Sequence, residues 1–239
     1  MIRFENVQKR YASGREALSG VSFTLERGEM AFLTGPSGAG KSTLLKLIAL
    51  IERPTRGTVL VNGQNTSRLP KRRIPGFRQR IGVVFQDHKL LHDRTVFDNV
   101  ALPLVIAGLT TRDIGRRARA ALDQVGLLDR ESHAPITLSS GEQQRVGIAR
   151  AVAPRPDVVI ADEPTGNLDL KTGQDIIEIL IKLREESGVT IVSNTHDHKM
   201  LGASDRVVDL RDGQVERIRN SDEITIEEGH IEGIEGVEV

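Results

Sequence analysis

A glycine-rich segment near the N-terminus has the residue types needed to bind phosphate. Residues 35–42 read GPSGAGKS and satisfy the pattern G-x-x-x-x-G-K-[ST] at every position. Glycines let successive backbone N–H groups face an anion, Lys41 can reach the terminal phosphates, and the Ser42 hydroxyl can bind Mg²⁺. The segment therefore predicts a site for nucleotide phosphates. Its predicted members are Gly35, Pro36, Ser37, Gly38, Ala39, Gly40, Lys41, Ser42 and Thr43.

Two carboxylates follow an apolar run in the second half of the chain. Residues 158–161 read VVIA, and Asp162 and Glu163 come directly after them. A carboxylate at the tip of a buried strand can hold Mg²⁺, and its neighbour can polarise the attacking water. Asp162, with Ser42, is therefore a predicted metal partner and Glu163 a predicted general base. The alternative, a strand that ends in two solvated acids, is disfavoured by the phosphate loop upstream.

A second anion site is predicted near residue 139. The segment LSSGEQQR lies far in sequence from the phosphate loop, and Ser139 stands just before a helical pattern. Serine is a favourable N-cap, and the N-terminus of a helix attracts anions. Taken alone, the segment favours an ordinary capped helix over an anion site.

The surrounding pattern predicts an α/β core that positions these motifs. A mostly helical insertion, about residues 87–153, lies inside it, and residues 69–80 contain too many Pro and Arg for a long helix. Expected strands are 2–7, 21–25, 30–34, 57–61 (followed by an Asn62-Gly63 hairpin turn), 81–85, 158–161, 190–194 and 206–210. Expected helices are 42–51, 95–106, 111–125, 141–153 and 170–186.

Composition excludes several classes of protein. The chain has no cysteine, which rules out disulfides, thiol nucleophiles and Cys-ligated metal centres. Its hydrophobic fraction of 38% suffices for a core, but no run approaches the ~18–20 apolar residues that span a bilayer. The first residues show no apolar secretory segment. We expect a soluble, cytosolic protein.

The zero net charge is unevenly distributed. Residues 220–239 contain seven acids and no Lys or Arg, so the 33 basic and 26 remaining acidic side chains of residues 1–219 give +7. This modest charge and the single tyrosine argue against direct nucleic-acid binding. The Ile/Glu alternation of the end is compatible with a further strand, whereas its glycines and uncompensated acids favour a mobile tail over 219–239.

Together, these motifs resemble those of ABC ATPases. LSSGEQQR is similar to the LSGGQ signature, and with GPSGAGKST and VVIADEP its order and spacing resemble one complete cassette, residues 1–218. The resemblance implies a P-loop NTPase fold of the α/β class, with a RecA-like, mostly parallel sheet, an antiparallel β subdomain and a helical subdomain. Ser140 departs from the family, which has a second glycine there. Serine could still donate to phosphate, but a positive φ would cost it ~1 kcal/mol or more.

The resemblance also implies roles for further residues. Tyr11 corresponds to the aromatic side chain that stacks on adenine, Gln86 to the glutamine that senses Mg²⁺ and contacts the membrane partner, and His196 to the switch histidine near the γ-phosphate. Catalysis is thus expected from Glu163, His196, Lys41 and Gln86, and metal binding from Ser42, Gln86 and Asp162. Contacts to nucleotide are also expected from Ser139, Ser140, Gly141, Glu142 and the D-loop Asp169. The other five histidines, His88, His92, His133, His198 and His230, show no metal-ligand spacing and are interpreted as structural.

The same resemblance implies partners. Two chains would form a homodimer that holds two ATP molecules head to tail, each with Mg²⁺, and hydrolysis would loosen it. The chain resembles the FtsE/LolD/MacB group, and residues 1–169 resemble FtsE most, which implies an FtsX-like permease, a cell-division role and a peripheral position on the cytoplasmic face of the bacterial inner membrane.

Several alternatives stay open at this point. The last third is equally similar to LolD- or MacB-type ATPases of lipoprotein release or export. A slow-hydrolysing interaction module is another possibility. A soluble cassette acting on DNA or ribosomes would have a coiled-coil insertion or a second cassette, and a small-molecule kinase would not need LSSGEQQ or His196.

Overall fold

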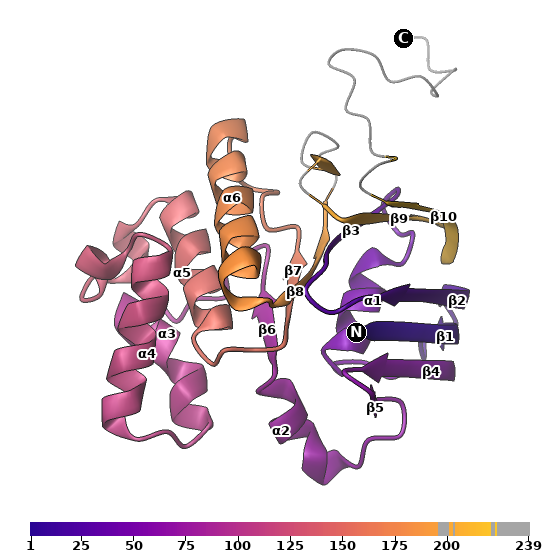
Figure 1. Ribbon diagram of the computed structural model, residues 1–239, viewed down its shortest axis with the longest axis horizontal. Coiled ribbons are helices and arrows are strands. Elements are labelled where there is room, and N and C mark those ends of the chain that lie inside the picture. Colours follow the sequence, from indigo (N-terminus) through magenta and orange to yellow (C-terminus); the bar gives the residue numbers. More distant parts are fainter. Residues whose placement is uncertain (196–200, 203, 221–222, 224–239) are drawn as a thin grey trace.

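Two sheets and a layer of helices build the structure (Figure 1). The computed structural model describes residues 1–195, 201–202, 204–220 and 223. In these residues, every neighbouring pair of the larger sheet is parallel except the edge pair β10–β9. Its order is β10 (Gln214–Asn220), β9 (Arg206–Arg211), β3 (Met30–Thr34), β8 (Thr190–Asn194), β7 (Val158–Asp162) and β6 (Ile81–Val84). The smaller, antiparallel sheet has the order β2 (Glu16–Leu25), β1 (Ile2–Arg10), β4 (Arg56–Val61) and β5 (Gln64–Asn65).

Strand β3 shows why the larger sheet is buried on both faces. All five of its residues are buried, and alternate side chains point to opposite faces of a strand. Met30 and Phe32 join the core shared with the helical layer. Ala31 and Leu33 join a second core, formed with the smaller sheet and with helix α1 (Lys41–Ile48). The continuous apolar run MAFLT is thus typical of a central parallel strand.

The predicted helical insertion connects the neighbouring strands β6 and β7. It contains α3 (Val96–Ile106), α4 (Thr111–Gln124) and α5 (Ser140–Val152), with short 3₁₀ turns η2 (Leu128–Arg130) and η3 (Pro135–Thr137). Thr95, Thr110 and Ser139 cap the three helices, each accepting the backbone N–H of the residue three positions later. Local sequence therefore fixes where each helix begins. Helix α6 (Leu170–Ser187) follows β7 and contacts α5.

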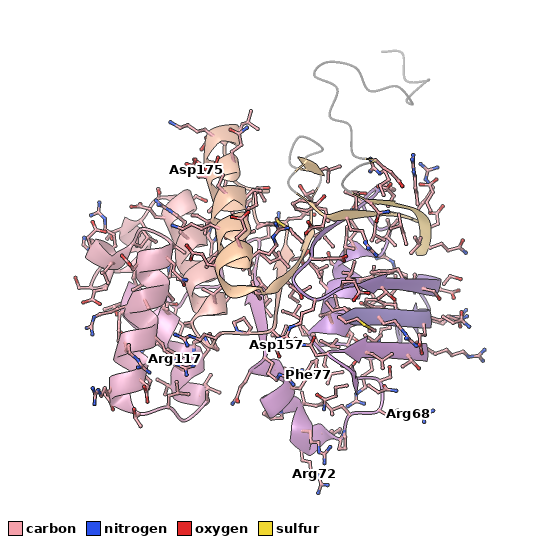
Figure 2. The ribbon with its side chains drawn as sticks, viewed as in Figure 1. Arg68, Arg72, Phe77, Arg117, Asp157 and Asp175 are labelled. Atoms are coloured by element: carbon pink, nitrogen blue, oxygen red, sulfur yellow. The ribbon has the colours of Figure 1, made fainter. Side chains whose placement is uncertain are left out.

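The predicted strands and helices agree with the structure in type, and the structure adds short helical turns in residues 69–80 and one edge strand. Asn62 and Gly63 have φ of 49° and 76° and form the predicted hairpin turn between β4 and β5. Residues 69–80 form η1 (Lys71–Arg73) and the one-turn α2 (Ile74–Arg78), held to the core by the buried Phe77, while Arg72 lies at the outer end (Figure 2). Edge strand β10 was not expected, because its sequence QVERIRN is mostly polar. None of its residues is buried.

The C-terminal region is described only in part. Strand β10 ends at Asn220, so the predicted acidic tail lies outside the described residues except for Glu223. None of the helices in the described part of the chain has the length and apolar character that a bilayer crossing requires.

Candidate active site

The phosphate loop connects the C-terminal end of β3 to the N-terminus of α1. Gly35, Gly38 and Gly40 have positive φ angles of 127°, 84° and 108°, which residues with a Cβ rarely adopt. A Cβ on Gly35 would lie 2.0 Å from the Leu210 carbonyl oxygen of β9. Gly35 and Gly40 are therefore required both by backbone conformation and by close packing, and Gly38 by backbone conformation. The loop leads into the N-terminus of α1, which favours anions.

Lys41 lies inside this loop. Its Nζ donates to the carbonyl oxygens of Gly35 at 2.5 Å and Pro36 at 3.1 Å, and the residue is 5% exposed. Burial lowers the pKa of Lys41, while the carboxylates of Glu163 and Asp162 oppose that shift. The ammonium is thus oriented by the phosphate loop and lies in the field of the predicted base, Glu163, and the predicted metal partner, Asp162.

Ser42, Asp162 and Asn194 form a hydrogen-bonded cluster at the carboxyl ends of two neighbouring strands. The Ser42 hydroxyl donates to Asp162 Oδ1 at 3.0 Å, and Asn194 Nδ2 donates to the same oxygen at 2.5 Å. Asp162 and Asn194 are paired in the register of β7 and β8. A hydroxyl and a carboxylate oxygen at this spacing suit Mg²⁺. The described residues contain no group of three or more His, Cys, Asp or Glu side chains that could hold a metal ion, so this pair would share Mg²⁺ with other oxygen ligands, such as those of phosphate.

Glu163 and Gln86 lie on the same side of the loop that follows β7. Glu163 has a φ of 49°, unusual for a residue with a side chain, and its backbone N–H donates to Asn194 Oδ1. A Cβ placed on Gly166 would lie 3.2 Å from Gln86 Nε2 and 3.4 Å from Glu163 Oε2. Asn167 Nδ2 also donates to the Gln86 carbonyl oxygen at 3.4 Å. The predicted base and the predicted Mg²⁺ sensor are therefore neighbours.

An open cavity of about 320 Å³ adjoins these groups. Tyr11 is one of the residues that line this cavity, and the Tyr11 hydroxyl is 3.3 Å from Thr43 Oγ1. The Lys9 ammonium lies over the Tyr11 ring, 4.9 Å from the ring centroid. Arg15 lies 3.5 Å from the Gly38 carbonyl oxygen and was not predicted. The cavity is lined by Tyr11, Arg15, Ser37, Gly38, Ala39, Gly40, Lys41, Ser42, Thr43, Lys46 and Glu163.

The predicted signature residues belong to another part of the molecule. None of Ser139, Ser140, Gly141 and Glu142 lines the cavity. Ser139 and Glu142 form a reciprocal cap: Glu142 N donates to Ser139 Oγ at 3.2 Å, and Ser139 N to Glu142 Oε2 at 2.8 Å. This bond lowers the pKa of Glu142. Ser140 is the first residue of α5 and has no positive φ, so the cost foreseen for serine there does not arise.

A model of the ABC transporter family matches residues 18–166. The chain belongs to this family. The match includes the phosphate loop, the signature segment and both carboxylates. It confirms the predicted ATPase class, and the sheets and helices described above confirm the predicted cassette fold.

Relatives across bacteria support the ABC assignment. The chain is 55% identical over 216 residues to "Cell division ATP-binding protein FtsE" of Escherichia coli K12, covering 90% of this chain and 97% of that protein. A Bacillus subtilis protein of the same name is 44% identical over 218 residues, 91% of this chain and 95% of the relative. These matches extend beyond residue 169 into the last third of the chain, which by its motifs alone is equally similar to LolD- or MacB-type ATPases.

A solved ABC cassette has the same fold. A structure described as a dimeric post-hydrolysis state of the cassette MJ0796 bound to ADP and Pi aligns with a TM-score of 0.84 and 38% identity. The alignment covers 92% of this chain and 99% of that one. Nucleotide binding by the present chain follows from its family.

Two outcomes complete the comparison with the sequence. His196 lies outside the described residues. Asn194, which is buried and bonds both Asp162 and Glu163, was not among the predicted site residues. A polar residue that ends a buried strand beside the one ending in Asp162 was the available signal.

Close packing at the signature helix gives a stability prediction. A Cβ on Gly141 would lie 2.4 Å from Thr172 Cγ2 at the start of α6. Thr172 cannot rotate away freely, because its Oγ1 donates to Asp169 Oδ2 at 2.6 Å; this bond also lowers the pKa of Asp169. We expect Gly141→Ala to lower the free energy of unfolding by about 1–3 kcal/mol, measured by urea denaturation.

Thr172→Ser is the matched rescue, because serine keeps the hydroxyl and lacks Cγ2. The double variant should regain most of the lost stability. A Gly141→Ala variant as stable as the parent would show that α5 and α6 are not packed as closely as described.

Proposed function

We propose that this chain is the ATP-hydrolysing subunit that drives an FtsX-like membrane protein in bacterial cell division. The observation that carries the proposal is the convergence of Lys41, Ser42 and Glu163 on one cavity, with Asp162 hydrogen-bonded to Ser42. Similarity to the FtsE proteins supports the cell-division role and the FtsX-like partner. With such a partner, the chain would be peripheral, on the cytoplasmic face of the inner membrane.

The proposed reaction centre needs two chains. The cavity holds the phosphate loop and the base, whereas the signature residues lie elsewhere on the same chain. A second copy placed head to tail would bring its α5 N-terminus, with its positive dipole end, against the γ-phosphate. The dimeric ABC cassette of similar fold supports this arrangement.

The predicted site residues would then have defined tasks. Lys41 binds the β- and γ-phosphates, and Tyr11 stacks on adenine. Glu163 accepts a proton from the attacking water, which Gln86 and His196 help to orient. Ser42, Asp162 and Gln86 would hold Mg²⁺, which when bound neutralises charge developing on the phosphate oxygens.

An exposed apolar surface on α3 suits a membrane partner. Leu102, Val105 and Ile106 are 37%, 56% and 70% exposed. Asn99, fully buried on the same helix, accepts from the backbone N–H of Leu91 at 2.7 Å and donates to its carbonyl oxygen at 3.0 Å. Movement of the segment that follows Gln86 would therefore be passed to α3.

Weakening this surface should uncouple the chain from its partner. We expect the double variant Val105→Ser/Ile106→Ser to co-purify with the FtsX-like membrane protein about tenfold less than the parent, because it removes roughly two apolar contacts. The ATPase rate of the isolated chain should not change. Ile136→Ser, 75% exposed in η3, is the matched control and should retain binding. Equal loss in both variants would contradict docking on α3.

Turnover with and without the partner tests the proposal as a whole. ATP hydrolysis by the purified chain should change several-fold when an FtsX-like four-span membrane protein is added in detergent or nanodiscs. A rate that is low and indifferent to the partner would instead favour a slow-hydrolysing interaction module. Response only to a LolCDE- or MacB-type permease would move the function to lipoprotein release or export.

A further inference from the structure

The loop after Gln86 has an unusual conformation that helix α5 holds in place. His88 and Lys89 both have positive φ, 57° and 48°, which residues with a Cβ rarely adopt. Arg150 of α5 donates to both of their carbonyl oxygens, at 2.6 Å to His88 and 2.7 Å to Lys89. The loop is therefore fixed to the helix whose other end carries the signature.

The His88 ring lies along one face of that helix. Its Nδ1 is 2.5 Å from Gln144 Oε1, and its Nε2 is 3.4 Å from Ser140 Oγ, the long end of a hydrogen bond. Ser140, Gln144 and Gly147 recur once per turn and so share a face. A Cβ on Gly147 would be 4.0 Å from the His88 carbonyl oxygen. One imidazole thus connects the buried middle of α5 to its exposed first residue.

The Gln144 amide allows this chain of hydrogen bonds to run in either direction. The residue is 0% exposed, and its Nε2 has no hydrogen-bond partner in the described structure. With Oε1 facing the ring, Nδ1 donates to Gln144 and Nε2 accepts from the Ser140 hydroxyl. Turning the amide over makes Nδ1 the acceptor and Nε2 the donor. The Ser140 hydroxyl is then free to donate outward.

We propose that His88 is a positioning residue for ATP bound across the dimer interface, and that it orients the Ser140 hydroxyl as an additional phosphate ligand. The glycine found at this signature position in the family has no such hydroxyl. Ser140 is exposed, and it stands at the helix end that the proposed dimer turns toward the partner's γ-phosphate. The inference rests on the proposed function, because it requires that dimer.

Two replacements of His88 separate its two ring nitrogens. Asparagine tolerates positive φ and matches Nδ1, but it does not reach Ser140. Glutamine places an amide nitrogen near the position of Nε2. His92→Ala is the matched control, because His92 is an exposed histidine of the same loop region for which the described structure gives no side-chain hydrogen bond.

The test measures the Mg²⁺-ATP concentration needed for half-maximal dimerisation, by light scattering, in a Glu163→Gln reference chain. His88→Asn and Ser140→Gly should each raise it about tenfold, the effect of one hydrogen bond to a charged group. The double variant should be no weaker than Ser140→Gly alone. His88→Gln and His92→Ala should resemble the reference. Without nucleotide, the thermal midpoints report any purely structural effect.

The failures are distinguishable. If the reference chain does not dimerise with ATP, the proposed function and this inference both fail. If it dimerises and Ser140→Gly needs no more ATP, only the inference fails. Additive effects of His88→Asn and Ser140→Gly on the ATP concentration would also overturn it, because His88 would then act independently of the hydroxyl.

Discussion

Replacing Glu163 by Gln is expected to lower ATP turnover about 10²- to 10⁴-fold, the usual contribution of a general base. Glutamine keeps the size of the side chain and removes the carboxylate that accepts the proton. The backbone N–H of residue 163 still donates to Asn194, so the left-handed turn should be retained. ATP should still bind and hold two chains together, which sedimentation velocity with Mg²⁺-ATP would show as a stable dimer.

Glu178→Gln provides the matched control for charge. Glu178 is an exposed glutamate on α6, away from the cavity-lining residues. Its variant should hydrolyse ATP at the parental rate. Parental turnover by Glu163→Gln would remove Glu163 from the chemistry.

Replacing Lys41 by Ala is expected to weaken ATP binding about 10²-fold, because a buried ammonium makes charge-assisted hydrogen bonds to phosphate. Lys41 is almost fully buried and already donates to two carbonyl oxygens of the loop. Isothermal titration with Mg²⁺-ATP measures the loss directly.

Lys46→Ala distinguishes this specific contact from a loss of positive charge. Lys46 lies on the same helix and lines the same cavity, but its side chain is exposed. Its removal should weaken ATP binding only a few-fold, and less at high salt. Equal losses of ATP affinity in both variants would mean that Lys41 contributes only its positive charge and makes no specific contact with phosphate.

Local sequence was sufficient to locate the phosphate loop and the two carboxylates. The phosphate loop follows a fully buried strand and precedes a helix, and its glycines have the positive φ that the motif predicts. Asp162 was predictable because it ends another apolar strand. The pairing of Ser42 with Asp162 is a consequence of sheet order, which places β7 near α1 in space.

Features that depend on tertiary contacts could not be read from the sequence. Asn194 became a site residue only because β8 lies between β3 and β7 in the sheet. His88 has no metal-ligand spacing, so its sequence indicates only a structural residue. Its partners Gln144 and Ser140 are more than fifty positions away along the chain, so local sequence does not predict these contacts. The concern over Ser140 was removed by its place in the first turn of α5, where φ is negative and a Cβ is tolerated.

The dependence of specific ATPase activity on chain concentration tests the central claim most directly. If each reaction centre is shared between two copies, turnover per chain should fall on dilution as the dimer dissociates. Added Glu163→Gln chain should then change the rate of the parent by forming mixed dimers. Turnover per chain that stays constant down to concentrations where light scattering detects only monomer would contradict the shared site.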